Sequence, residues 1–242
     1  MTENGRKNTR RLELGALSDH TVDVSYLLQT QDEVRKAPFA NGWEPLPNKA
    51  LDELTARIGH LDSRYPISPF TTLIAQANLP FYNNVRLIRL VDPTWKNQGA
   101  VLYFLYCDDE LFRLDGHSQN IHKVNRIARL ELTDDTVLDY LRFFSFFNHG
   151  EHGAFLIAER MSQEFLPDFE NAEFREILRD FLFPPYLNGI TRDDQFDCGA
   201  CVFYGNTIFM ATFHIDPAGP IEMVDDDPVF HDLDVSVSVN LG

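Results

Sequence analysis

The sequence of 242 residues contains only three cysteines, Cys107, Cys198 and Cys201. So small and odd a number excludes the disulfide framework that holds many small secreted domains together. No apolar run approaches the roughly 18 residues that a membrane-spanning helix requires. The first eleven residues also lack the apolar stretch of a secretory signal. These absences predict a soluble intracellular protein, cytoplasmic by default, with no membrane partner.

Basic residues are also scarce, because 21 Lys and Arg stand against 37 Asp and Glu and leave a formal net charge of −16. Four of the basic residues lie within the first eleven positions: Arg6, Lys7, Arg10 and Arg11. The acidic remainder repels phosphate backbones, which proteins bind by replacing counterions with Lys and Arg. We therefore expect no nucleic-acid partner, whereas complementary charge would attract a basic protein.

The short motifs of nucleotide and acyl-transfer chemistry are missing. The chain has no G-x-x-x-x-G-K-[ST] loop, no G-x-G-x-x-G loop and no G-x-S-x-G elbow. The first two form phosphate cradles from glycine-rich backbone, and the third exposes a nucleophilic serine. The sequence thus identifies no cofactor, and any enzymatic activity would belong to a class without a short linear motif.

Hydrophobic periodicity and turn residues predict a mixture of strands and helices. Strands are expected at 85–91, 100–107, 111–114, 154–158, 200–204, 207–215 and 221–224, and helices at 51–61, 68–77, 133–147 and 174–182. The helix that begins at Thr133 is apolar almost all round, which is typical of a buried central helix. The dipeptide Gly205-Asn206 suits a two-residue hairpin turn.

Hairpins outnumber β-α-β units, so the fold class predicted is α+β with mainly antiparallel sheet. We expect the central helix to be buried and the helices to pack on one face of the sheet. Residues 1–15 are interpreted as a flexible tail and residues 16–242 as a single domain. A division into two subdomains near residue 165 is the alternative.

Two local patterns could hold a metal ion. His149, Glu151 and His152 follow the apolar helix in a glycine-containing loop, where imidazole and carboxylate are suitable ligands. The alternative is an exposed polar loop that joins helix to strand. Cys198 and Cys201 form a C-x-x-C that could supply half of a zinc site or a redox pair. The alternative is that the two cysteines are small residues at the start of a strand.

The favoured functional hypothesis is a non-catalytic interaction protein that binds another protein, basic in character, through its acidic surface. The acidic run Asp225-Asp226-Asp227 is the candidate partner-binding segment, because opposite charge speeds encounter.

Two further hypotheses remain open. The first is a metal-assisted hydrolase built on the histidine and cysteine patterns above. The second is a small-ligand sensor with a pocket lined by phenylalanines such as Phe70, Phe81, Phe165, Phe169 and Phe174.

Overall fold

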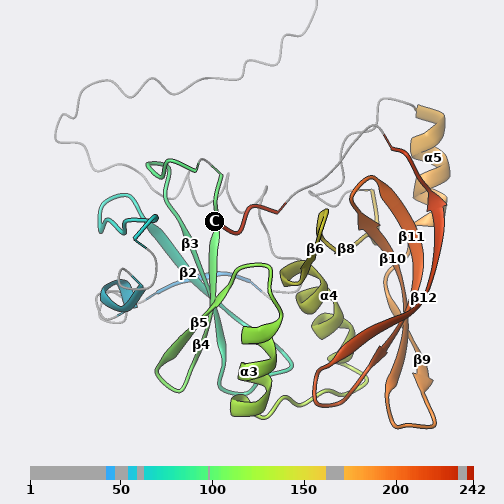
Figure 1. Cartoon of the computed structure of the whole chain (residues 1–242), viewed down its shortest axis with the longest axis horizontal. Helices are drawn as coiled ribbons and strands as arrows, with labels where there is room; N and C mark the ends of the chain where they lie inside the picture. The colour runs from blue at the N-terminus through green and yellow to red at the C-terminus, as the bar shows by residue number, and fades with distance from the viewer. Residues whose placement is uncertain (1–41, 47–53, 59–62, 98, 162–171, 234–238) are drawn as a thin grey trace, which may run out of the picture.

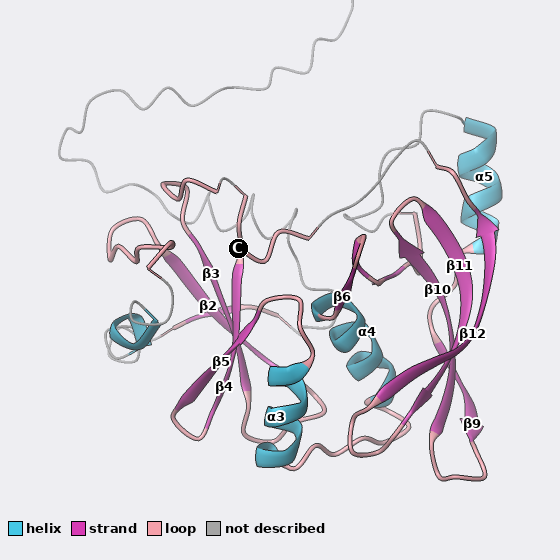
Figure 2. Cartoon of the chain, in the orientation of Figure 1, coloured by secondary structure: helices cyan, strands magenta, loops and turns pink. Residues whose placement is uncertain are grey.

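The computed structural model describes residues 42–46, 54–58, 63–97, 99–161, 172–233 and 239–242. Within them the chain combines helices with antiparallel sheets, which confirms the α+β class (Figures 1 and 2). None of the described helices is both long and apolar enough to cross a membrane. The expected tail at 1–15 and the alternative division near 165 lie outside the described residues.

The first sheet is a five-stranded antiparallel sheet with its strands in chain order. Its strands are β1 (Glu44–Pro45), β2 (Leu73–Asn78), β3 (Arg86–Val91), β4 (Leu102–Cys107) and β5 (Glu110–Leu114). The strands predicted at 85–91, 100–107 and 111–114 are therefore confirmed as β3, β4 and β5. Each neighbouring pair in this sheet is antiparallel, and β4 and β5 are joined by the short turn Asp108-Asp109.

Both faces of the first sheet are covered. Alternate residues of β3 enter two different apolar clusters, with Leu87 in one and Ile88 in the other. The second cluster includes Leu54 and Ile58, which lie in the helical residues 54–58. Helical residues therefore pack on both faces rather than on one, in contrast to the expectation. The physical reason is that β3 and β4 are apolar almost continuously, so neither face can be left to water.

Helices α3 (Gln119–Ala128) and α4 (Val137–Phe147) pack into the first apolar cluster. Eight of the eleven residues of α4 are buried. The ring of Tyr103 on β4 lies 5.0 Å from Phe147 and 6.2 Å from Phe146, centroid to centroid. Helix α4 also contacts β7 (Gly153–Ala154) and β8 (Leu156–Ile157), and Figure 1 shows it between the two sheets.

The second sheet has the order β12-β11-β10-β8, with β9 paired to the other end of β10. Its longer strands are β9 (Tyr186–Ile190), β10 (Phe196–Tyr204), β11 (Thr207–Ile215) and β12 (Ile221–Phe230). The hairpin between β10 and β11 has the predicted two-residue turn, with Gly205 at φ +61°. Helix α5 (Ala172–Phe181), close to its predicted position, packs Phe174 and Phe181 against Phe230 at 5.3 Å.

The helix predicted over residues 68–77 is wrong, because this segment forms a turn followed by β2. The carboxylate of Asp92 accepts hydrogen bonds from the hydroxyls of Thr71 at 2.8 Å and Thr72 at 2.7 Å. These bonds fix the turn, and β2 then pairs along its length with β3. Helix α3 was not predicted, although Ile121, Val124 and Ala128 follow a helical spacing and are buried.

The turn between β11 and β12 is tied to the helices by a chain of buried hydrogen bonds. The Tyr140 hydroxyl donates to the carbonyl oxygen of Gly219 at 2.8 Å. It accepts a bond from the Asn125 side-chain amide, also at 2.8 Å, and the Tyr82 hydroxyl donates to the Asn125 side-chain oxygen. Gly219 is at φ +104°, where glycine is favoured. The chain of bonds therefore fixes the position from which β12 starts.

Candidate functional site

Strand β12 forms the outer edge of the second sheet. It is ten residues long, and the seven consecutive residues from Glu222 to Pro228 are all exposed. Within the described part of the chain, no strand pairs with its outer edge. An edge of this kind presents unpaired backbone N–H and C=O groups, to which a further strand can be added.

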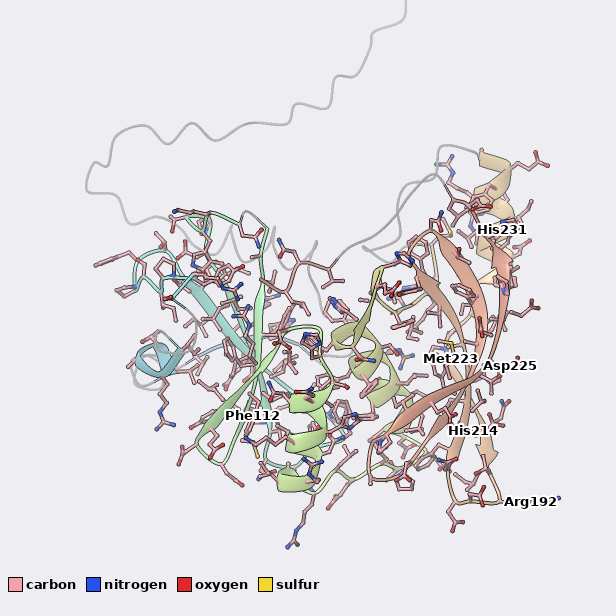
Figure 3. All side chains as sticks on the ribbon, in the orientation of Figure 1. Phe112, Arg192, His214, Met223, Asp225 and His231 are labelled. Atoms are coloured by element: carbon pink, nitrogen blue, oxygen red, sulfur yellow. The ribbon has the colours of Figure 1, made fainter. Side chains whose placement is uncertain are left out.

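The acidic run lies on this edge but is divided between the two faces of the sheet. Directly paired residues of antiparallel strands project to the same face, and successive residues alternate. Asp225 pairs with Thr212 and Asp227 pairs with Met210, whereas Asp226 pairs with Ala211 between them. Two of the three predicted partner-binding carboxylates therefore share a face, and the third projects to the opposite one. Figure 3 labels Asp225 on this strand.

Four carboxylates gather on the face shared by Asp225 and Asp227, which we call the acidic face. The face is defined by Asp197, Glu222, Asp225 and Asp227, because the register also pairs Asp197 with His214 and His214 with Glu222. Asp197 and His214 are partly exposed, and the other three acids are exposed. The sequence analysis missed Asp197 and Glu222, since only the register places them beside the acidic run.

The charge of this region is strongly one-sided. Between Tyr186 and Leu233 the sequence has nine acidic residues and a single basic one, Arg192. The 99 residues from 63 to 161 have eleven acidic and ten basic residues and are nearly neutral. The second sheet therefore creates a negative potential that attracts cations and basic segments.

The histidine pattern forms a small hairpin of β6 (His149–Gly150) and β7. The His149 amide donates to the carbonyl oxygen of Gly116 at 2.8 Å, and the buried ring nitrogen Nε2 of His149 has no hydrogen-bond partner among the described residues. Burial lowers the pKa of His149, which favours the neutral ring. The backbone amide of His152 donates to the Tyr204 hydroxyl at 3.0 Å, and Glu151 is exposed.

The cysteine pattern lies in the middle of β10. Cys198 and Cys201 are three residues apart in a strand, so their side chains project to opposite faces. Cys198 pairs with Phe213, whereas the Cys201 sulfur is 3.6 Å from the Met210 sulfur. Burial raises the pKa of Cys198 to about 12 and that of Cys201 to about 11, so both are neutral thiols.

These metal-site candidates are not brought together. His149, Glu151 and His152 lie in a hairpin next to the first sheet's β5–α3 loop, and the two thiols lie apart on the faces of β10. Among the described residues, no group of three or more His, Cys, Asp or Glu side chains could hold a metal ion.

The phenylalanines proposed as a pocket lining are dispersed. Phe70 is 89% exposed, Phe81 is 1% exposed in the core, and Phe174 packs on Phe230. Phe165 and Phe169 lie outside the described residues. One hollow, between β1, β2 and β3, has a volume of about 50 Å³. Sites for small-molecule ligands usually have roughly 300–1,000 Å³.

Comparison with known proteins adds no constraint on this site, since no family model, no curated protein and no solved structure matches the chain. What the arrangement can do must therefore be argued from its own geometry. Its distinguishing features are an exposed edge strand and an adjacent face that bears four carboxylates.

Proposed function

We propose that this chain is a protein-binding protein that acts without catalysis, and that it binds a basic, extended segment of another protein along β12. The observation that carries the proposal is the exposure of seven consecutive residues of this edge strand, four of them acidic. The lack of convergence among the histidine and cysteine candidates favours binding over metal-assisted hydrolysis.

The mode we propose is strand addition. A segment that pairs with β12 would gain backbone hydrogen bonds, which supply affinity for any extended sequence. Its side chains would alternate between the two faces, as those of β12 do. Residues beside Asp225 and Asp227 would meet carboxylates on the acidic face, and a residue beside Asp226 would meet one on the other face. A run of Lys or Arg therefore fits both faces.

The same charges make a second copy of this chain a poor occupant. Two β12 strands placed side by side would bring acidic runs together, and like charges on adjacent strands are destabilising. A basic segment reverses the sign of that interaction. Pairing of two β12 edges is therefore disfavoured, whereas pairing of β12 with a segment of opposite charge is favoured.

The test is the binding of a fluorescently labelled ten-residue peptide of alternating Lys and Thr to the full chain, followed by anisotropy. We expect binding at 50 mM NaCl that weakens at least about tenfold at 300 mM, because salt screens exposed charges. The double reversal D225K/D227K should abolish binding. The matched reversal D134K/D135K makes the same change in net charge at exposed residues before α4 and should leave most of it.

Two results would contradict the proposal. One is the absence of peptide binding at 50 mM NaCl, and the other is equal loss of binding in the two reversal variants, which would indicate a response to net charge alone. A peptide with N-methyl groups at alternate residues keeps the charge but cannot pair fully as a strand. If it binds as well as the parent peptide, strand addition is wrong.

A further inference from the structure

The short hairpin of β6 and β7 connects the two sheets. On one side, the His149 amide donates to the carbonyl oxygen of Gly116 at 2.8 Å, in the loop between β5 and α3, and Asn148 forms a β-bridge with the same glycine. On the other side, the His152 amide donates at 3.0 Å to the hydroxyl of Tyr204, the last residue of β10. Figure 1 shows β6 between the two sheets, beside α4.

The hairpin is closely packed on both of these sides. A Cβ atom added to Gly116 would lie only 3.1 Å from Cγ of His149, so the imidazole ring lies directly against the backbone of this glycine. A Cβ atom added to Gly150 would overlap the Tyr204 hydroxyl, and the Tyr204 ring stacks on Phe155 at 4.2 Å with the two planes 8° apart. The His149 ring is therefore the side chain that holds the hairpin to the loop of the first sheet.

The surroundings of the His149 ring accommodate one ring hydrogen but not two. The ring donates a hydrogen bond to the backbone carbonyl of Phe146, at the end of α4. Because Nε2 is buried and has no partner among the described residues, the donor is Nδ1. A second proton would therefore be added to Nε2, where it would place a positive charge and an unpaired donor out of contact with water, and such burial is costly.

The charged groups near the ring do not remove this cost. Burial, which lowers the pKa of His149, is the largest effect, while the bond to Phe146 raises the pKa, the charge of His117 lowers it and that of Asp115 raises it. His117 and Asp115 lie in the loop before α3 and are both exposed, so water screens them. Within the hairpin itself, Glu151 and His152 are exposed as well. The net result is a ring that stays neutral while the hairpin is in place.

We infer that His149 is a pH-sensitive switch, which holds the hairpin of β6 and β7 against the first sheet when its ring is neutral and releases the hairpin when the ring is protonated. The neutral ring fits between Gly116 and the Phe146 carbonyl. The protonated ring becomes solvated only when the hairpin leaves this position, so acid favours the released form. The contact with Tyr204 uses a backbone amide, and the released hairpin stays attached to the second sheet through it.

Proton linkage gives the direction and size of the effect. In the released hairpin the pKa of His149 returns to its ordinary value of 6.5, whereas it is lower in the closed form. The stabilisation of the closed form is therefore complete above pH 6.5 and is lost as the pH falls below it. The ratio of released to closed form rises by up to about tenfold for each pH unit below 6.5.

The experiment is amide hydrogen exchange of the full chain, followed by NMR at pH 7.5 and pH 5.5 in buffer that contains EDTA. Each rate is expressed as a protection factor, relative to an unstructured peptide at the same pH. We expect the protection factor of the His149 amide to fall by about three- to tenfold at pH 5.5, because this amide loses its acceptor on Gly116 when the hairpin is released. The Ala158 amide, which donates to the carbonyl oxygen of Cys201 at 2.9 Å in the second sheet, should keep its protection.

Two variants separate this switch from a general effect of acid. H149N keeps a donor near the position of Nδ1 and cannot be protonated, so the amide at position 149 should have the same protection at both pH values. H152N removes the exposed histidine of the same hairpin and should keep the full pH dependence. An unchanged protection factor of His149 in the starting chain would overturn the inference, and this measurement decides even if H149N does not fold. An equal fall at Ala158, or a pH dependence that persists in H149N, would overturn it as well.

Discussion

Asn125 joins Tyr82, in the loop between β2 and β3, to Tyr140 on α4, and it is 4% exposed. Its oxygen accepts a bond from Tyr82 and its amide donates to Tyr140, which donates onward to Gly219. Burial raises the pKa of both tyrosines, so both hydroxyls remain protonated donors. Each buried polar group is satisfied only because the others are in place.

Asn125→Ala should therefore lower the free energy of unfolding by about 2–3 kcal/mol, because it leaves the buried Tyr82 hydroxyl without an acceptor and removes the amide that donates to the Tyr140 hydroxyl. Urea denaturation followed by circular dichroism measures the change. The control is Asn83→Ala, which removes an exposed amide that donates to Glu131 at 3.0 Å, and which should cost less than about 0.5 kcal/mol. Equal small losses in the two variants would mean that water replaces the Asn125 side chain.

At this scale, sequence patterns could identify candidate residues but could not place them together. The spacing of Cys198 and Cys201 indicates a shared site only if the backbone between them forms a loop. Both residues instead lie in strand β10, which directs their side chains to opposite faces. The contact of Tyr186 with Gly199 could not be predicted either, because it depends on the register of β9 and β10. That register changes at an irregularity between Asp197 and Cys198, which no sequence pattern marks.

The element that decides the candidate site is β12. The acidic run on β12 is consistent with two roles. Charges on an edge strand prevent self-pairing, and they also favour a basic partner. Register irregularities near Ile208 and Thr212 divide the pairing of β11 with β12, and Pro228 removes one backbone donor. The three aspartates lie between these features, where the edge is most regular.

If the charges protect this edge, D225T/D227T should self-associate, because threonine favours strands and removes the repulsion. Sedimentation velocity over a range of protein concentrations should detect larger species for this variant. D134T/D135T removes two exposed charges away from the sheet and should sediment like the starting chain. Unchanged sedimentation of D225T/D227T at every concentration would mean that the irregularities and Pro228 protect the edge without the charges.

The strands that were predicted correctly are those whose signal is local. The hairpin of β10 and β11 has two apolar strands around Gly205-Asn206, so both its turn and its pairing could be expected. The segment Leu73–Asn78 carries no such signal. The preceding residues Ser68-Pro69 suit the start of a helix. Hydrogen bonds to Asp92 and pairing with β3, both distant in the sequence, instead produce a turn followed by a strand.

Across the whole molecule, the net charge of −16 is partitioned unevenly. The 99 residues from 63 to 161 are nearly neutral, whereas residues 186–233, which contain strands β9 to β12 and their turns, have nine acidic residues and one basic residue. The sequence alone predicted an attraction to basic partners. It could not predict that Asp197 shares one face with Glu222, Asp225 and Asp227, because that follows from the pairing of three strands.

The apolar cluster that contains residues of both sheets also holds several groups that lose a proton at alkaline pH. Burial raises the pKa of Tyr82, Tyr140 and Cys107, and raises the pKa of Cys198 to about 12 and of Cys201 to about 11. In the unfolded chain these groups return to about 9.0 for cysteine and 10.0 for tyrosine. Above pH 9 the folded chain therefore binds more protons than the unfolded one.

The free energy of unfolding should consequently be unaffected by these groups below pH 9 and fall steadily from pH 9 to 11. Each group that ionises only on unfolding contributes about 1.4 kcal/mol per pH unit once its unfolded form has lost its proton. Urea denaturation at pH 7, 9, 10 and 11 measures the decline. Cys198→Ala combined with Cys201→Ala should lower stability at pH 7, because side-chain atoms leave the core, and should make the alkaline decline shallower. An equally steep decline in this variant would mean that the two thiols ionise within the folded chain, and that β10 opens to solvent well below the pH at which the molecule unfolds.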